Sequence, residues 1–464
     1  MPGTWRARLA TRLAAPVDGA SIGAFRIAFG AILLFEVLDY FRRGWIARYW
    51  IDPGWHFAYW GFEWVRPWPG SGMLWHFAAL AALAACIALG LATRAAAALF
   101  CAGFTYVFLI DQARYMNHLY LVCLLSGLVA IVPSGRALSP GALWRRDERS
   151  PWVPAGALHL LRAQFAIVYV FGGLAKLNPD WISGAPMRMA LAGAPPLGPL
   201  EPLLATEWAV RFFGFGGLAF DLLIVPALLW KPTRPWAVAA SVTFHLSNAR
   251  MFRIGIFPWL MLAATTLFLE PDWPRRAIAR LGLPVRPPRA SGAAEPAPDW
   301  LLAVLALTLA VQVLLPLRHF LYPGDPSWTE EGHRFAWRMK LHVKQATRPR
   351  FEIVADGRRF DVDVDAHLGR WQSLRMATRP HLIHQFCRHL AEAVRARGAT
   401  QVQCFADVRV ALNGRRLRPL VDPRVDLAAE PRSWLPAAWI LPLDEPLPPP
   451  WRPPRRPGRG GGEG

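Results

Sequence analysis

The chain has 464 residues, of which 54% are hydrophobic and only 18% are charged, and its formal net charge is +20. Soluble domains usually carry about 25% charged residues, and the eight or nine apolar stretches of this chain cannot share one soluble core. The positive charge does not indicate nucleic-acid binding. The Arg residues cluster in loops between the apolar stretches, as they do at the cytoplasmic face of membrane proteins.

The apolar stretches predict a multi-pass α-helical membrane bundle over residues 20–317. The predicted spans are 22–41, 73–92, 95–110, 118–133, 157–175, 210–230, 236–248, 254–269 and 300–317. The stretch 236–248 is too short to cross about 30 Å of hydrocarbon at about 1.5 Å per residue. We therefore expect a half-span there, and eight or nine helices in all.

The distribution of basic residues predicts the orientation of these spans. With the N-terminus inside, the inner loops hold 15 Lys and Arg residues and the outer loops hold 9. Basic residues concentrate on the cytoplasmic side of membrane proteins. The region after residue 317 is therefore expected to lie outside the cytoplasm.

The predicted outer loop 42–72 is rich in tryptophan, with one every four or five residues. These residues are Trp45, Trp50, Trp55, Trp60, Trp64 and Trp68. Trp favours the membrane–water interface, so the loop is expected to lie along the outer surface. It serves either as an anchor alone or also as the lining of an access route for a substrate.

Residues 318–445 predict a β-rich α+β soluble domain. The stretch 335–344 alternates apolar and polar residues like a half-buried strand. Asp356-Gly357, between the short apolar runs 351–354 and 360–364, is a type I′ hairpin signal, and Asn413-Gly414 marks a second hairpin.

The same domain is expected to contain one long helix over 380–397, with a proline near its start and Gly398 as its stop. Cys387 and Cys404 are able to pair if this domain lies in an oxidising compartment. The tail 446–464 is rich in Pro, Gly and Arg and is predicted to be disordered.

Ionisable residues inside membrane spans usually mark a site or a buried pair. Topology places His118, Lys176 and His245 near the outer ends of their spans, which predicts an outward-facing site formed by the three. The alternatives are a Lys that reaches the head groups and His residues that only bridge helices. Arg162 and Asp221 are expected to form a structural contact. The other candidates are Arg26, Glu36 and Asp39.

Several long motifs occur in order along the chain. They are R-Y-M-N-H-L-Y-L (114–121), F-G-G-L-A-K-L-N-P-D-W (171–181), F-H-L-S-N-A-R-M-F-R-I-G-I-F-P-W-L-M-L (244–262), E-P-D-W-P-R (270–275), W-T-E-E-G-H-R-F-A-W-R-M (328–339) and D-P-R-V-D (422–426). In these motifs the chain resembles, over roughly residues 20–445, the vitamin K-dependent γ-glutamyl carboxylases and their bacterial relatives with the same transmembrane domain.

This resemblance implies an enzyme that oxidises vitamin K hydroquinone, or a related menaquinol, to its epoxide. The reaction is coupled to carboxylation of peptide glutamate, with oxygen and carbon dioxide as co-substrates. The partners implied are the lipid bilayer, the quinone and a Glu-containing peptide or protein. No metal is expected. The composition further favours a bacterial inner membrane, with the soluble domain in the periplasm.

The resemblance also implies roles for individual residues. Lys176 matches the base that deprotonates the hydroquinone, and His118 matches a His that assists the chemistry. The expected substrate-binding residues are Tyr115, Asn117, His245 and Asn248. Ala175 stands where the animal enzymes carry the first Lys of a pair, and those enzymes extend beyond the end of this chain. Recognition of a propeptide is therefore not implied.

Base chemistry requires a neutral amine, and an apolar site favours the neutral form because burial disfavours a charge. The site must also exclude water. This chemistry is wrong if the structure places the amine nitrogen in bulk water, or buries it against a carboxylate with no cavity nearby. The alternatives are a quinone epoxidase without protein carboxylation, a quinone- or lipid-binding protein or transporter, and a structural scaffold. The lack of internal repeats disfavours a transporter.

Overall fold

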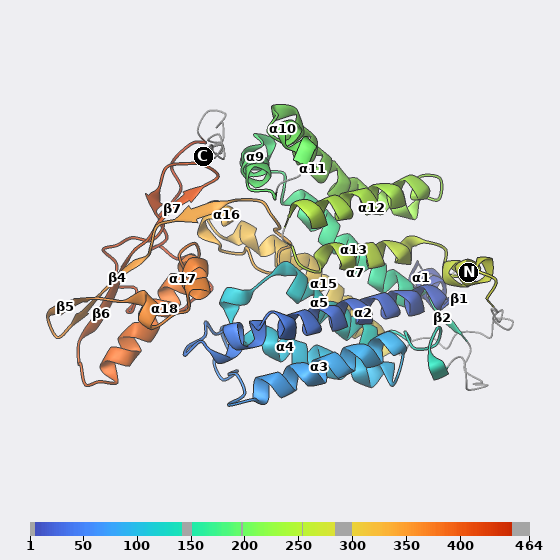
Figure 1. Cartoon of the computed structure of the whole chain (residues 1–464), viewed down its shortest axis with the longest axis horizontal. Helices are drawn as coiled ribbons and strands as arrows, with labels where there is room; N and C mark the ends of the chain where they lie inside the picture. The colour runs from blue at the N-terminus through green and yellow to red at the C-terminus, as the bar shows by residue number, and fades with distance from the viewer. Residues whose placement is uncertain (1–4, 142–150, 196–197, 253, 284–298, 448–464) are drawn as a thin grey trace, which may run out of the picture. The chain divides into compact units, whose positions relative to one another are not determined.

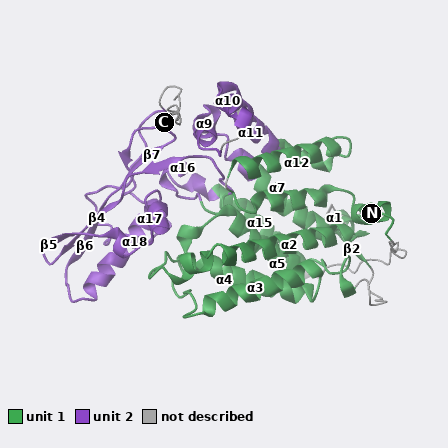
Figure 2. Cartoon of the chain, in the orientation of Figure 1, with its two compact units in different colours: residues 1–170, 223–317, 334–336 green, residues 171–222, 318–333, 337–464 purple. Residues whose placement is uncertain are grey.

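The computed structural model describes residues 5–141, 151–195, 198–252, 254–283 and 299–447. The chain divides into two compact units (Figure 2). Unit 1 comprises residues 1–170, 223–317 and 334–336, and unit 2 comprises residues 171–222, 318–333 and 337–464. Most of the tail predicted to be disordered lies outside the described residues.

Unit 1 is built mainly of long apolar helices that run side by side (Figure 1). Its long helices are α2 (Ala20–Arg42), α3 (Gly72–Leu89), α4 (Thr93–Ile110), most of α7 (Ala155–Leu174), α12 (Arg234–Met251) and α15 (Asp299–Leu317). Two shorter apolar helices are α5 (Asn117–Ile131) and α13 (Phe257–Thr265). Its shorter elements include α1 (Trp5–Ala14), α14 (Trp273–Arg280) and a ribbon of β1 (Pro16–Asp18) with β2 (Trp152–Pro154).

Six helices in the described part of the chain are long and apolar enough to cross a membrane, and two shorter apolar helices accompany them. This confirms the predicted multi-pass bundle. The predicted half-span at 236–248 is part of a longer helix, α12, which begins at Arg234, with Pro235 in its first turn, and continues to Met251. With 18 residues it is still not among the six helices that are apolar enough to cross a membrane.

The helices α2 and α3 pack closely because Gly30 has no side chain. A Cβ at that position would lie only 2.4 Å from the backbone nitrogen of Ala88. Near this crossing the buried Arg26 donates hydrogen bonds to the carbonyls of Ile87 (2.8 Å) and Leu138 (2.5 Å). Arg26 therefore donates to a carbonyl at the end of α3, where no further helical turn exists to donate N–H groups to it.

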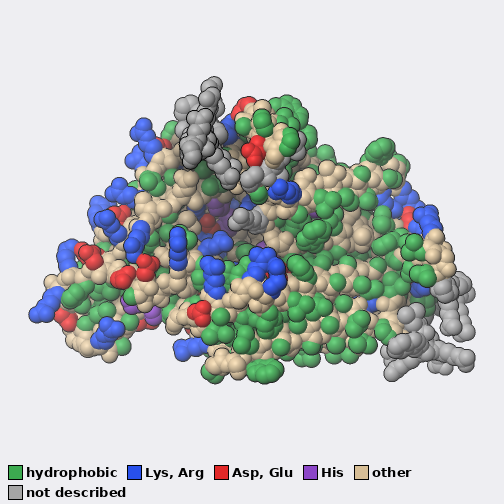
Figure 3. Space-filling model, in the orientation of Figure 1, with side chains coloured by type: hydrophobic (Ala, Val, Ile, Leu, Met, Phe, Trp, Pro, Cys, Tyr) green, Lys and Arg blue, Asp and Glu red, His purple; other side chains and the backbone are tan. Residues whose placement is uncertain are grey.

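Hydrophobic side chains cover much of the helical surface shown in Figure 3. On α15, for example, Leu307 is 66% exposed and Leu314 is 64% exposed. Exposed apolar side chains along a whole helix are unfavourable in water and favourable in lipid. The chain is therefore an integral membrane protein.

Unit 2 combines helices with two three-stranded antiparallel sheets, in the orders β3-β7-β8 and β5-β4-β6. The strands are β3 (Lys344–Ala346), β4 (Arg350–Ala355), β5 (Arg358–Asp361), β6 (Val402–Asp407), β7 (Arg409–Leu412) and β8 (Arg418–Pro419). The helices are α8 (Pro179–Ile182), α9 (Ala185–Ala192), α10 (Glu201–Leu204), much of α11 (Glu207–Leu229), α16 (Pro326–Thr329), α17 (Arg370–Met376) and α18 (Pro380–Arg395).

The predicted hairpins are confirmed. Asp356 and Gly357 both have positive φ, at 46° and 79°, and connect β4 to β5 as a type I′ turn requires. Asn413 and Gly414 do the same, at 52° and 85°, between β7 and β8. The predicted long helix is α18, which ends shortly before Gly398.

Two other expectations for this region have different outcomes. Cys387 and Cys404 are buried, and both are free thiols. The strand predicted over 335–344 is wrong, because only Lys344 of that stretch belongs to a strand. Phe335, Trp337 and Lys340 have φ values of 55° to 60°. Such left-handed backbone is incompatible with a continuous strand.

Candidate functional site

Lys176 lies just after the end of α7, and two glycines allow the helix α11 to approach it. A Cβ on Gly173 would lie 2.6 Å from the side chain of Leu222, and one on Gly172 would lie 3.2 Å from the carboxylate of Asp221. Because these Cβ atoms are absent, Asp221 reaches the amine of Lys176. The G-G pair in the motif is thus explained by close packing of two helices.

The amine of Lys176 donates a hydrogen bond to a carboxylate oxygen of Asp221 and another, at 3.2 Å, to the carbonyl of Gly172. Both side chains of the pair are only 9% exposed. The amine also lies 5.4 Å from the centre of the Trp181 ring, in cation–π geometry. The amine of Lys176 is therefore almost completely buried between one carboxylate, one carbonyl and one aromatic ring.

The predicted contact between Arg162 and Asp221 is wrong. Arg162 instead donates hydrogen bonds to the carbonyls of Leu267 (2.8 Å) and Leu269 (3.3 Å), at the end of an apolar helix. Asp221 is the partner of Lys176. Sequence reasoning missed this role, although the isolated acid in an apolar helix and the G-G pair both indicated a close buried contact.

The amine of Lys176 is buried against a carboxylate. This is one of the two features that together would exclude base chemistry, the other being the lack of a nearby cavity. Any role of Lys176 as a base must therefore include Asp221. This donor and acceptor set suits a ligand that brings an acidic hydroxyl group, such as a reduced quinone.

Four residues after Lys176, Asp180 is held by a second set of buried partners. Arg415 binds both carboxylate oxygens of Asp180, at 2.6 Å and 2.8 Å, and Asn413 donates to one of them at 2.7 Å. These partners come from the β7–β8 hairpin, far along the chain. The sequence did not predict this cluster. Its only indications were that Asp180 lies in the motif 171–181 and that Asn413 lies in a predicted hairpin.

His118 lies in the first turn of α5, and the chain turns tightly against its ring at Gly255. This glycine has a φ of 57°, and a Cβ there would lie 3.2 Å from Nε2 of His118. The preceding residue, Asn117, accepts a hydrogen bond at 2.9 Å from the hydroxyl of Tyr115. The Tyr115 hydroxyl in turn accepts one at 2.7 Å from the backbone N–H of Phe335.

His245 is 1% exposed in α12, and its Nε2 lies 2.8 Å from the hydroxyl of Tyr169 on α7. This contact matches the expectation of an interhelical bridge. Asn248 lies one turn further along the same helix. His118 and His245 belong to unit 1 and Lys176 to unit 2, so the meeting of the three side chains stays a prediction.

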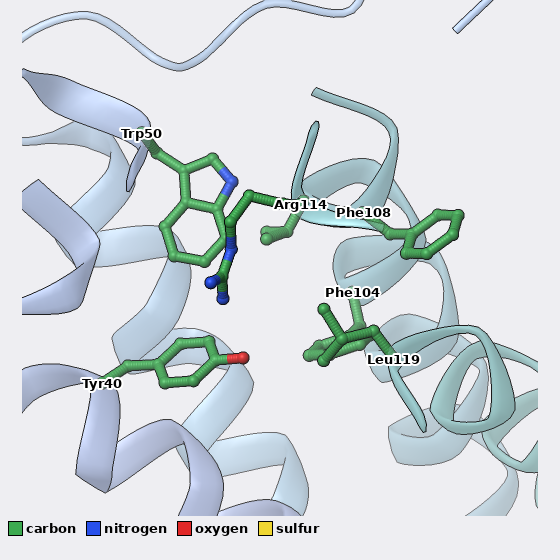
Figure 4. Close-up of a pocket in the computed structure, with 7 residues that line it drawn as sticks. Tyr40, Trp50, Phe104, Phe108, Arg114 and Leu119 are labelled. Carbon is green, nitrogen blue, oxygen red and sulfur yellow. The ribbon is translucent and has the colours of Figure 1, made fainter. Parts of the chain in front are cut away.

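A small pocket in unit 1 lies between α2, α4 and the start of α5 (Figure 4). Its apolar walls include Phe104 and Leu119, and the side chains of Tyr40, Trp50 and Arg114 point into it. Nε1 of Trp50 and Nε of Arg114 are buried and have no hydrogen-bond partner among the described residues. Trp50 thus lines an internal space, whereas Trp64 and Trp68 of the same loop are 74% and 51% exposed.

A second buried charged cluster lies in unit 2, outside the spans. Lys344 donates to Glu330 at 2.7 Å, and the rings of His333 and His342 flank the same carboxylate. Burial lowers the pKa of His333 to about 4, and burial likewise places the pKa of His342 well below its ordinary value. Burial alone would raise the pKa of Glu330, but the surrounding positive groups outweigh it and hold that pKa well below its ordinary value.

Comparison with known families accounts for both parts of the chain. The HTTM domain model matches residues 14–273, which is more than half of the chain, and the model of the lumenal domain of vitamin K-dependent gamma-carboxylase matches residues 297–446. No solved structure matches the chain. The two matches cover both the helical part with its buried Lys176 motif and the sheet-containing part with its Asp180 partners. The chain therefore belongs to the vitamin K-dependent γ-glutamyl carboxylase family.

Proposed function

We propose that this membrane protein oxidises reduced vitamin K, or a related menaquinol, to the epoxide and couples this reaction to carboxylation of glutamate in a peptide. The observation that carries the proposal is the buried pair of Lys176 and Asp221. Lys176 belongs to the motif 171–181, which resembles the family's catalytic segment, and Asp221 reaches it from α11. The membrane is expected to be a bacterial inner membrane, with the lumenal-type domain in the periplasm.

The pair suits proton abstraction because its charges are costly to bury. The effective desolvation penalty is of the order of several kcal/mol per ion, so moving the lysine proton to Asp221 removes two buried charges. Lys176 is then a neutral amine that takes a proton from a quinol hydroxyl. Starting from either form of the pair, the products are the same: Lys176 as an ammonium, Asp221 as a neutral acid and the quinol as an anion.

When bound, the reduced quinone together with oxygen supplies the strong base that removes a γ-proton of glutamate. The residues of the chain bind, orient and exclude water. His118 is proposed to assist proton movement beside the quinone. Tyr115 and Asn117, with His245 and Asn248, are proposed to contact substrate. The backbone of Phe335, from the motif of the lumenal-type domain, is hydrogen-bonded to Tyr115.

The test uses purified protein in lipid nanodiscs with reduced vitamin K, a Glu peptide and labelled bicarbonate. Wild type is expected to form epoxide and labelled peptide, and Lys176→Ala neither. Lys231→Ala is the matched control, since Lys231 is 77% exposed. Epoxide without labelled peptide identifies an epoxidase that does not carboxylate. Quinone binding without either product, unchanged in Lys176→Ala, overturns the proposal in favour of a binding protein or transporter.

A further inference from the structure

We propose that Asp180 and Arg415 are positioning residues, through which the sheet β3-β7-β8 fixes the loop that carries Lys176. This inference rests on the proposed role of Lys176 as the base. Its observation is the buried fork: the two terminal nitrogens of Arg415 bind the two oxygens of Asp180, with side chains 8% and 10% exposed. Bidentate arginine–carboxylate contacts fix orientation as well as distance.

The segment from Lys176 to Asp180 is held by hydrogen bonds within the turn itself. The side chain of Asn178 accepts a hydrogen bond from the backbone N–H of Trp181 and donates one to the carbonyl of Ala175, at 2.9 Å and 2.8 Å. The backbone N–H of Asn178 binds the carbonyl of Lys176 at 2.9 Å. A shift of Asp180 therefore moves the backbone of Lys176 with it.

The same segment also fixes the surroundings of the amine. The indole N–H of Trp181 donates to the carbonyl of Gly214 on α11 at 3.0 Å. The Trp181 ring faces the amine of Lys176, and Asp221 lies two turns further along α11. Asp180, next to Trp181 in sequence, thus holds the segment that sets the distance between Lys176 and its carboxylate partner.

The two residues of the β7–β8 hairpin that bind Asp180, Arg415 and Asn413, are themselves held by further hydrogen bonds. Asn413 is 2% exposed and exchanges hydrogen bonds with the backbone of Val343, at 2.9 Å and 3.0 Å, while it donates to Asp180. Nε of Arg415 donates to the carbonyl of Glu445 at 2.9 Å. Each donor is therefore held by its own second contact, so Arg415 and Asn413 present a fixed surface to Asp180.

A positioning role and a purely structural role predict different results. A 1 Å displacement of a catalytic group costs up to about 10²-fold in rate, whereas loss of a structural contact lowers only the folded fraction. The informative variants are Arg415→Lys, which keeps the charge and loses the fork, and Asp180→Asn, which keeps the shape and loses the charge. Arg418→Lys is the matched control, since Arg418 pairs with Glu445 at 2.9 Å in the same hairpin but is 57% exposed.

The experiment measures epoxide formation per folded protein and, separately, the rate at which a small amine-acylating reagent modifies Lys176, read by mass spectrometry. Both variants are expected to lower kcat for epoxide by about tenfold or more, with KM for the quinol little changed. Both are expected to change the acylation rate of Lys176, and Arg418→Lys to change neither. Equal kcat and acylation rates in the folded fraction of Arg415→Lys and Arg418→Lys overturn the positioning role.

The two measurements distinguish failure of the proposed function from failure of the positioning role. If wild type forms no epoxide, the acylation of Lys176 still decides whether the fork positions the amine. If Asp180→Asn does not fold, Arg415→Lys carries the test, because it leaves a positive charge opposite Asp180. An acylation rate that the fork variants leave unchanged overturns the inference whether or not the protein turns over.

Discussion

The amine of Lys176 and the carboxylate of Asp221 are in direct hydrogen-bonded contact, and both side chains are almost completely buried. The contact joins the loop after α7 to the middle of α11. Each group is therefore a direct hydrogen-bond partner of the other in a largely buried contact. The pair is accordingly the unit on which activity is expected to depend.

The first prediction concerns Asp221→Asn. An amide cannot accept a proton, so the variant lacks the group that is proposed to end as a neutral acid when the quinol loses its proton. Epoxide formation is expected to fall by about 10²-fold or more, in the range of general acid–base effects. Epoxide is measured by chromatography against wild type. Asp272→Asn is the control, because Asp272 is 47% exposed and pairs with Arg276 at a surface; it is expected to retain full activity.

The second prediction separates stability from activity. Replacing both members, as Lys176→Met with Asp221→Leu, removes two buried polar groups and keeps their volume. Such replacements are often neutral or stabilising by about 1–4 kcal/mol. The double variant is expected to melt at or above the wild-type temperature in detergent and to form no epoxide. A double variant that melts well below wild type would show that the pair contributes net stability.

The third prediction concerns the close approach of the two helices. In Gly173→Ala the added methyl meets the side chain of Leu222, and overpacking of this kind costs about 1–3 kcal/mol. The helix α11 is displaced at the level of Asp221, so activity is expected to fall together with thermal stability. Leu222→Ala in the same chain is expected to restore both in part.

The control for this prediction is Gly127→Ala. The nearest atom to a Cβ at Gly127 is the Sγ of Cys101, at 3.6 Å, which is an ordinary contact. Stability and epoxide formation are expected to be close to wild type. If Gly173→Ala and Gly127→Ala behave alike, helix packing does not control the Lys176–Asp221 contact.

Much of the fold was predictable because it depends on local patterns. Apolar length identified the spans, and Asp356-Gly357 identified a hairpin because few other sequences tolerate two positive φ values in succession. The strand predicted over 335–344 failed because side-chain alternation does not report backbone handedness. Phe335 and Trp337 take left-handed conformations that only the surrounding tertiary structure imposes.

The partners of the candidate site were not predictable for a related reason. The sequence marked Lys176 and Asp221 as costly to bury, but 45 residues separate them and the pairing depends on how α7 and α11 pack. Arg162 binds backbone carbonyls at a helix end instead of an acidic side chain. Arg415 meets Asp180 across 235 residues. Burial cost identifies groups that need partners, whereas packing decides which partners they receive.

The last prediction concerns acid stability and the cluster of Glu330, His333, His342 and Lys344. Burial lowers the pKa of His333 from 6.5 to about 4, so between these values the unfolded chain binds a proton that the folded chain does not. Stability therefore rises with pH across this window and is lost as pH falls through it, by up to about 3 kcal/mol. The lowered pKa values of His342 and Glu330 act in the same direction.

The measurement is thermal unfolding of the detergent-solubilised protein between pH 7 and pH 5. Wild type is expected to lose stability steadily as the pH falls. His333→Gln removes one titrating group and is expected to flatten this dependence, whereas His367→Gln, at an exposed position, is expected to leave it unchanged. The same slope in both variants would mean that His333 takes up its proton in the folded state, and that the buried cluster does not set the acid limit of the lumenal-type domain.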